Sequence, residues 1–206
     1  MDGQPESRHD LSPVLLASIY EGKTFSADWT SGNFPLWATL LKPYCGTATR
    51  IIEVGCWEGL SALFFLNYLP RASLVCIDTF DTTGEPLLTI PSPKLAEFGI
   101  DWTKFDSNLE RRFDANVAGF GERLEKIRAS SNVALAELGI DGRKFDVAYI
   151  DGSHRSVDVY CDAVLMWPMM VQGGMIIFDD YQWGYMPGTR EHPKLGIDCF
   201  LHAFEG

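Results

Sequence analysis

Hydrophobic residues in this chain gather in short compact runs that alternate with longer amphipathic segments. The compact runs are rich in β-branched and aliphatic residues and predict strands at residues 49–55, 73–78, 124–128, 145–150 and 175–178. The amphipathic segments predict helices at residues 13–21, just before Pro43, at 61–69, 107–121 and 131–139, and in the segment that ends at Pro168. Such an alternation is typical of an α/β fold with a doubly wound, mostly parallel sheet of the Rossmann-like kind.

Local features add detail to this outline. Gly173 and Gly174 are expected to turn the chain into the last strand, and residues 79–106 have weak periodicity, which predicts a long irregular excursion.

We divide the chain into an N-terminal helical brace or lid, residues 1–45, and a core, residues 46–206, within one globular domain. The helix before Pro168 is expected to bury Val157, Cys161, Val164 and Leu165.

The composition disfavours two classes of partner. The chain has 206 residues, enough for one sizeable α/β core, with 28 acidic and 17 basic residues and a net charge of -11. This charge repels the phosphate backbone of RNA or DNA. The N-terminus lacks a basic stretch followed by an apolar run, and the apolar runs elsewhere are far too short to cross a bilayer. We therefore expect a cytoplasmic protein with neither a nucleic-acid nor a membrane partner.

A glycine-containing turn after the first strand is the first candidate for ligand binding. Gly55 and Gly59 allow a tight bend there, but the middle glycine of a dinucleotide-binding loop is missing, because Trp57 occupies its place. A tight strand-to-helix turn without a ligand is the alternative interpretation. The candidate cofactor-binding residues of this segment are Glu53, Gly55, Cys56, Trp57, Glu58, Gly59 and Ser61.

The ends of the second and third strands carry further candidates. Asp78 closes the second strand, where an acidic side chain can accept hydrogen bonds from both ribose hydroxyls of an adenosine, and Thr79 follows it. A solvated strand-end aspartate is the alternative. Ser130, after the third strand, is expected either beside the adenine ring or as a helix cap.

Acidic residues end the fourth and fifth strands. Asp151 follows the fourth strand, and Asp179 with Asp180 follows the fifth. Three clustered carboxylates would repel one another unless a cation joined them, so an oxygen-ligated metal such as Mg²⁺ is expected, with separate solvated acids as the alternative. His154 lies three residues beyond Asp151 and is a candidate general base, with a capping or surface histidine as the alternative.

Taken in order, the segments IIEVGCWEGLSALFFLNYLP, LVCIDTF, RRFDANVAGFGERLEKI, DVAYIDGSH and GGMIIFDDYQWG resemble class I S-adenosylmethionine-dependent methyltransferases. The similarity covers residues 27–200 and is greatest to bacterial macrocin-type sugar O-methyltransferases. It implies O-methylation of a small-molecule hydroxyl (a sugar, phenol or natural product) with S-adenosylmethionine as the cofactor.

The resemblance also implies roles for individual residues. Glu53 would help to hold the cationic amino end of the cofactor, and Asp151, Asp179 and Asp180 would ligate a divalent metal, Mg²⁺ being the candidate. His154 and Asp151 would be catalytic, and Asp151 would also adjoin the cofactor. Apart from the resemblance, four aromatic residues are candidates for walls of the pocket, with ordinary core or surface aromatics as the alternative: Trp29, Phe80, Trp183 and Tyr185.

The sequence departs from this family after its fifth strand. Members normally continue into a final antiparallel strand pair, which is not evident here, so the fifth strand is expected to be an exposed edge. A second copy of the chain, forming a homo-oligomer, is a candidate cover for that edge. Two other functions remain open: a non-catalytic S-adenosylmethionine-binding module, and a nicotinamide-dependent oxidoreductase, which the missing middle glycine disfavours.

Overall fold

A computed structural model describes residues 11–81, 108–184 and 188–204 of the chain. Most of the predicted excursion at residues 79–106, the predicted start of a helix at residue 107 and Tyr185 lie outside the described residues.

The centre of the molecule is a single parallel sheet of five strands within the described residues. Its order is β3-β2-β1-β4-β5, so the chain starts in the middle, winds to one edge and then returns to build the other. This arrangement confirms the predicted doubly wound α/β fold. The strands are β1 (Arg50–Val54), β2 (Ser73–Asp78), β3 (Leu124–Arg128), β4 (Phe145–Ile150) and β5 (Met170–Phe178).

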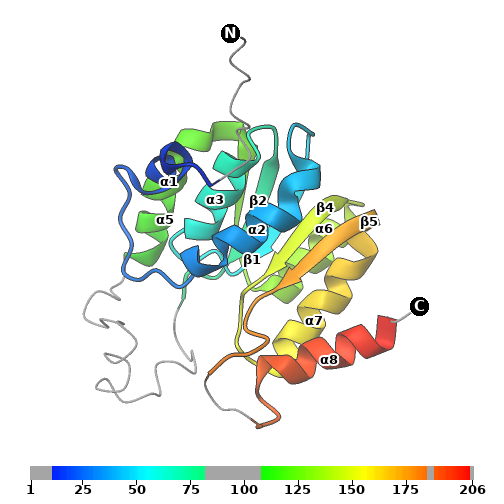
Figure 1. Cartoon of the computed structure of the whole chain (residues 1–206). Helices are drawn as coiled ribbons and strands as arrows, with labels where there is room; N and C mark the ends of the chain where they lie inside the picture. Colours follow the sequence, from blue (N-terminus) through cyan, green and yellow to red (C-terminus); the bar gives the residue numbers. More distant parts are fainter. Residues whose placement is uncertain (1–10, 82–107, 185–187, 205–206) are drawn as a thin grey trace, which may run out of the picture.

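Helices cover both faces of the sheet (Figure 1). On one face lie α1 (Pro13–Tyr20), α2 (Phe34–Leu41), α3 (Leu60–Tyr68) and α5 (Leu109–Val117), and on the other lie α6 (Ser131–Ile140), α7 (Ser156–Met166) and α8 (Pro193–Phe204). Because β1 is followed by a helix on the first face and its neighbour β4 by one on the second, the winding reverses between these strands. A ligand site is expected at this switch point, beyond the carboxyl ends of the strands.

Alternating strand residues separate two hydrophobic cores. Ile51 of β1 and Tyr149 of β4 belong to the core beneath α1, α2, α3 and α5, whereas Ile52 and Ala148 belong to the core beneath α6, α7 and α8. The N-terminal segment shares the first of these cores, since Trp37 of α2 is buried in it. The candidate brace therefore packs directly on the sheet layer that carries β1 and β4.

The buried face of α7 was predicted wrongly. Val157 is 65% exposed and Cys161 is exposed, while Val164 and Leu165 are only partly buried. The reason is that two of the five buried positions of this helix are polar and therefore invisible to an apolar pattern. The buried residues are Ser156, Val159, Asp162, Ala163 and Met166.

The last strand begins earlier than predicted. It starts at Met170, and Gly173 and Gly174 lie within it at a bulge, where the register against β4 shifts between Phe145 and Val147. Among the described residues β5 pairs only with β4, so its other edge has no strand partner there. None of the described helices has the length and apolar character needed to span a membrane.

Candidate active site

The segments that follow the five strands surround one cavity of about 720 Å³. This volume lies within the range of small-molecule and cofactor sites. Gly55 to Glu58 and Ser61 line its centre, Asp78 and Ser130 one end, and Asp151, His154, Asp179 and Asp180 the other. The structure thus brings most of the sequence-predicted residues to a single pocket at the switch point of the sheet.

Both glycines of the turn after β1 have left-handed backbones. At each of them an added Cβ would meet another segment of the protein. At Gly55, with φ of 84°, an added Cβ would lie 2.0 Å from the carbonyl oxygen of Asp151. At Gly59, with φ of 83°, it would lie 3.0 Å from Val117 and 3.2 Å from Phe113 of α5. Glycine at residue 55 therefore allows the turn after β1 to meet the end of β4, which places Asp151 against this turn.

The carboxylate of Asp78 organises the same loop. Its Oδ2 accepts hydrogen bonds from the backbone N–H groups of Cys56 (2.8 Å) and Trp57 (2.9 Å), and its Oδ1 accepts one from Phe80 (2.7 Å). Trp57 and Phe80 have positive φ values of 48° and 52°, conformations that cost free energy for residues other than glycine. Asp78 thus stabilises a strained loop, and residues 55–58 of this loop line the cavity.

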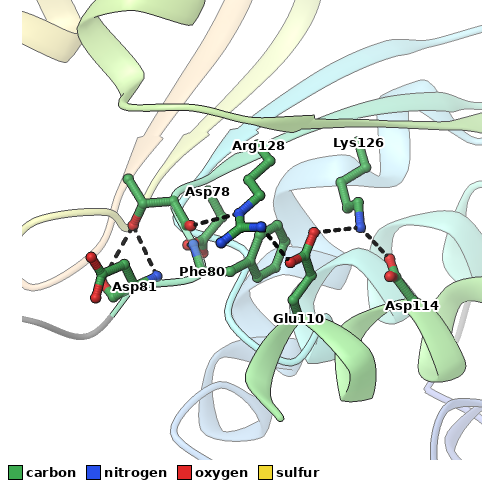
Figure 2. A network of polar contacts seen from close by, with 8 residues as sticks. Asp78, Phe80, Asp81, Glu110, Asp114, Lys126 and Arg128 are labelled. Carbon is green, nitrogen blue, oxygen red and sulfur yellow. Dashed lines mark hydrogen bonds and ion pairs between the residues drawn. The ribbon is translucent and has the colours of Figure 1, made fainter. Parts of the chain in front are cut away.

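A network of charged side chains fixes the turn after Asp78 (Figure 2). Arg128 at the end of β3 donates from Nε to the carbonyl oxygen of Thr79 (3.4 Å), and its Nη1 pairs with Glu110 of α5 (3.1 Å). Lys126 pairs with Glu110 (3.0 Å) and with Asp114 (2.6 Å). The turn that carries Thr79 is therefore tied to both β3 and α5.

Glu53 and Glu58 do not present free carboxylates to the cavity. Glu53 is completely buried and is absent from the residues that line the cavity; it accepts a short hydrogen bond from the hydroxyl of Ser61, which does line it. Burial raises the pKa of Glu53 to about 7. Glu58 accepts the backbone N–H of Ser26 (2.6 Å) and pairs with Arg112 (2.5 Å), so its carboxylate joins the N-terminal segment to α5.

Two polar residues of α7 that line the cavity, Asp158 and Asp162, were missed by sequence reasoning. Asp162 of α7 is 2% exposed yet lines the cavity, and burial raises its pKa to about 6. Asp158 accepts a hydrogen bond from Ser153 (2.7 Å) nearby. Ser130 precedes α6 at its N-cap position but makes no capping hydrogen bond through its side chain. The apolar pattern of α7 gave no signal for Asp162, because a polar residue at a buried position does not contribute to it.

At the opposite end, Asp151, His154 and Asp180 have ligand atoms that all lie within 4.8 Å of one another. His154 Nε2 is 3.2 Å from Oδ2 of Asp180, whose backbone has a φ of 58°. Burial, followed by repulsion from Asp179 and Asp180, raises the pKa of Asp151 well above its usual range. The geometry and the electrostatics both favour a positive charge at this point.

Asp179 is placed differently from the other two aspartates. It lies outside the compact group of ligand atoms, and its Oδ2 contacts the hydroxyl of Tyr149, which is also 2.9 Å from Oδ2 of Asp151. Burial is the largest cause of the raised pKa of Asp179. Tyr149 was missed from the sequence, although it lies on β4 two residues before Asp151, which directly follows the strand, a spacing that puts both side chains on one face.

A protein-family model described as a methyltransferase domain matches residues 52–181, which include the glycine turn, Asp78, Asp151, Asp179 and Asp180. The chain belongs to this methyltransferase family. A search of curated proteins found none that matches this chain.

Solved structures share the fold of the methyltransferase. MycE from the mycinamycin biosynthetic pathway is 18% identical, with a TM-score of 0.58 over 92% of this chain and 46% of MycE, so the methyltransferase spans about half the length of MycE. A putative O-methyltransferase from Klebsiella pneumoniae is 17% identical, with a TM-score of 0.61 over 98% of this chain and 80% of the other. TomG from Streptomyces achromogenes is 15% identical, with a TM-score of 0.61 over 98% and 79%.

Aromatic residues wall the cavity of the methyltransferase near the acidic cluster. The ring of Trp183 stacks on His154, with centroids 4.6 Å apart and planes 14° apart, and Trp29 lies 5.5 Å from Trp57. His192 holds Trp183 in place: its Nδ1 accepts the N–H of Lys194, so its Nε2 donates to the carbonyl oxygen of Trp183 (2.7 Å). Of the other predicted wall residues, Phe80 instead packs on Phe113 and does not line the cavity.

Proposed function

We propose that this methyltransferase moves the methyl group of S-adenosylmethionine to a hydroxyl oxygen of a small molecule. The observation that carries the proposal is a single cavity with two distinct ends. At one end lies the carboxylate of Asp78, which is suited to the ribose hydroxyls of an adenosine, and at the other lies the cluster of Asp151, His154 and Asp180. The glycine turn lies between them. This order matches a cofactor bound along the loop with its sulfonium facing the acidic cluster.

The adenosine half of the cofactor would bind beside the ends of β2 and β3. Asp78 would accept the ribose hydroxyls, with Thr79 and Ser130 alongside, and the turn from Gly55 to Ser61 would receive the methionine half. Glu53 would support Ser61 from beneath rather than touch the ligand, because Ser61 lies between it and the cavity. The MycE structure contains S-adenosylhomocysteine and the TomG structure contains S-adenosylmethionine, which supports this choice of cofactor.

A divalent cation such as Mg²⁺ fits the chemistry of the acidic cluster. Carboxylate oxygens are its preferred ligands, and Asp151, Asp179 and Asp180 would supply them. When bound, such a cation polarises an acceptor hydroxyl and favours its ionised form. The MycE structure contains Mg, which supports a cation here. MycE also contains mycinamycin VI, in keeping with a natural-product, sugar or phenol acceptor for this chain.

His154 would act as the general base. Its ring is oriented by Asp180 and by stacking on Trp183, so it can receive the hydroxyl proton of an acceptor held against the cluster. The acceptor oxygen then forms a bond to the methyl carbon as the carbon–sulfur bond breaks, and the bonding electron pair stays on sulfur. The positive charge of the sulfonium is lost in this step, so the residues contribute mainly by positioning and by excluding water.

The N-terminal segment, residues 1–45, would act as a brace or lid for the acceptor end. Four residues of this segment line the cavity: Phe25, Ala27, Trp29 and Thr30. Trp29 also contacts Trp57 of the glycine turn. An acceptor that reaches the acidic cluster would therefore meet this segment.

A methyl-transfer assay tests the proposal. The wild-type protein is incubated with labelled S-adenosylmethionine and a panel of sugars, phenols and natural products, with MgCl₂ or with excess chelator. We expect methylation that needs the cation and that is abolished in Asp151→Ala, while binding of S-adenosylhomocysteine persists. Full activity in excess chelator would contradict the role of the cation. Cofactor binding without methylation of any compound would instead favour a non-catalytic binding module.

Two matched variants separate the role of general base from the role of metal ligand at the cluster. His154→Gln should lose methylation yet keep its affinity for Mn²⁺, whereas Asp180→Asn should lose both. Equal loss of Mn²⁺ affinity in His154→Gln would make the histidine a ligand instead of a base.

We further propose that a second copy of the chain covers the outer edge of β5. The edge has unpaired backbone groups among the described residues, and such edges attract another strand. Light scattering should report a dimer, and a monomer at all concentrations would contradict this. The cytoplasmic location expected from the sequence stays a prediction.

A further inference from the structure

One hydroxyl contacts two of the proposed metal ligands at once. The hydroxyl of Tyr149 lies 2.9 Å from Oδ2 of Asp151 and makes a shorter contact with Oδ2 of Asp179. Asp151 follows β4 and Asp179 follows β5, so this single group joins the carboxyl ends of two neighbouring strands. The chemistry of the proposed reaction makes no other use of it.

The ring that carries this hydroxyl is immobilised. Tyr149 is completely buried, and its ring meets Trp37 of α2 edge to face, with centroids 4.9 Å apart. It meets Phe65 of α3 in the same way at 5.6 Å. Both partners belong to the same buried core, so the position of the hydroxyl is set by close packing.

The contacts of Asp179 explain what the hydroxyl does. Oδ1 of Asp179 accepts the backbone N–H of Asp180 (2.8 Å), and Oδ2 also receives a long contact from Asn33 Nδ2 (3.4 Å). Two neighbouring carboxylates repel each other and would rotate apart unless a donor or a cation joined them. The Tyr149 hydroxyl is the donor that both share, and it holds them from the core side.

We propose that Tyr149 is a positioning residue for the divalent cation: it fixes the carboxylates of Asp151 and Asp179 so that both can face one ion. The inference rests on the cation of the proposed function. Outer hydrogen-bond partners of this kind orient metal ligands, and their loss typically weakens metal affinity about 10- to 100-fold. Tyr149 itself touches neither the acceptor nor the cofactor in this scheme.

The test is a titration of the protein with MnCl₂, measured by calorimetry and by the electron paramagnetic resonance of bound Mn²⁺. Tyr149→Phe keeps the ring and its packing on Trp37 and Phe65, so it is expected to fold. Tyr68→Phe is the matched control, because Tyr68 is also a buried tyrosine of the same core and its hydroxyl donates to the carbonyl oxygen of Ala38 (2.7 Å). Thermal melting compares the two variants.

We expect Tyr149→Phe to bind Mn²⁺ about 10- to 100-fold more weakly than the wild type, and Tyr68→Phe to bind it equally well. Both should keep wild-type affinity for S-adenosylhomocysteine. Unchanged Mn²⁺ affinity in Tyr149→Phe would overturn the inference. Asn33→Ala removes the other side-chain contact of Asp179 and leaves Tyr149 in place, so it should bind Mn²⁺ as tightly as the wild type whether or not Tyr149→Phe folds. A weakening of about tenfold or more in Asn33→Ala would also overturn the inference.

Failure of the proposed function has a different signature. A wild-type protein that binds no Mn²⁺ would remove the cation from the proposed reaction, whatever the variants do. A wild-type protein that binds Mn²⁺ but not S-adenosylhomocysteine would remove the cofactor and leave the role of Tyr149 standing.

Discussion

Glu53 shows how one buried carboxyl group near the cofactor loop couples stability to pH. It is enclosed by the core, where its oxygens accept hydrogen bonds from the hydroxyl of Ser61 and from the thiol of Cys76 (3.5 Å). Burial penalises the ionised form more than these bonds favour it, so the pKa rises from 4.5 to about 7. The folded protein therefore binds a proton that the unfolded chain releases between these two pH values.

The expected pH dependence follows from that sign. Stability from the protonated Glu53 is full below pH 4.5 and is lost as the pH rises through about 7, with a cost of about 3 kcal/mol above it. Glu53→Gln, which cannot ionise, should match the wild type at pH 4 and exceed its free energy of unfolding by about 1–3 kcal/mol at pH 8. Urea unfolding at both pH values measures this. Glu58→Gln, which breaks the pair with Arg112, should destabilise at both; a Glu53→Gln variant that behaves the same way would refute the assignment.

Gly55 makes a second prediction at the residue scale. In Gly55→Ala the new Cβ would meet the backbone of Asp151 in a left-handed conformation, so we expect a loss of more than about 3 kcal/mol of stability and weaker cofactor binding. Gly22→Ala is the matched control, because Gly22 has a similar φ of 70° and nothing within 4 Å of its added Cβ. It should cost only about 1–2 kcal/mol. Chemical unfolding compares the two, and equal losses would mean that backbone strain alone requires glycine at residue 55.

The candidate residues divide by whether their role depends on a local or a distant partner. The location of Gly55, Asp78 and Asp151 at the cavity could be predicted from the sequence because each lies at or just beyond the end of a recognisable strand, and parallel strands bring their carboxyl ends together. The contacts of the Glu58 carboxylate could not be predicted, because its partners Ser26 and Arg112 lie far away in the chain. Sequence reasoning named Glu58 as a cofactor-binding candidate; the residue lines the cavity, and its carboxylate joins the N-terminal segment to α5.

At the scale of elements, ion pairs between β3 and α5 hold the turn that follows β2. Glu110 is the centre of this network, since it pairs with both Arg128 and Lys126, and Arg128 also contacts the backbone of Thr79 (Figure 2). Exposed pairs contribute about 0–1 kcal/mol each. Their effect should therefore be seen in how well the turn is positioned for a cofactor more than in global stability.

We expect Glu110→Gln to weaken S-adenosylhomocysteine binding about two- to fivefold at low ionic strength, with a smaller effect in high salt, because exposed ion pairs are screened. Calorimetric titration at two salt concentrations measures this. Glu125→Gln is the control: it changes the net charge by the same amount and removes a comparable exposed pair, with Arg143 at 2.9 Å, that does not contact the turn. Equal weakening in both variants would show that overall charge, and not the turn, is responsible.

The bounds and buried faces of elements were predicted correctly where apolar periodicity is unbroken. The predictions were wrong where polar residues are buried. The strand from Ser73 to Asp78 was predicted to the residue. The face of α7 was not, because Ser156 and Asp162 occupy buried positions: Ser156 lies under α8 next to Gly196, and Asp162 lies at the cavity. The start of β5 was missed because two glycines within a bulge have the same sequence signature as a turn.

At the scale of the whole molecule, the cavity couples folding to ligand binding. Its walls come from the ends of strands throughout the sheet and from helices on both faces, so an occupied cavity bridges the two hydrophobic cores. The sequence predicted the parallel sheet and the location of the site, since both follow from the order of strands and helices. It could not predict which distant helices close the site, such as the packing of α2 and α3 on Tyr149, because that depends on contacts between segments far apart in the chain.

A ligand that binds only the folded protein stabilises it by mass action, by about 2.7 kcal/mol at a hundredfold excess over its Kd. For a chain of this length each kcal/mol raises Tm by about 2–4 °C, so saturating S-adenosylhomocysteine should raise Tm by about 5–10 °C. NAD should produce no comparable shift, because the loop lacks the middle glycine that lets a backbone approach a pyrophosphate. Differential scanning fluorimetry with each compound measures this. Because both contain adenosine, an equal rise with NAD would mean that the Asp78 end alone binds the ligand and that the glycine turn does not select a sulfonium amino acid.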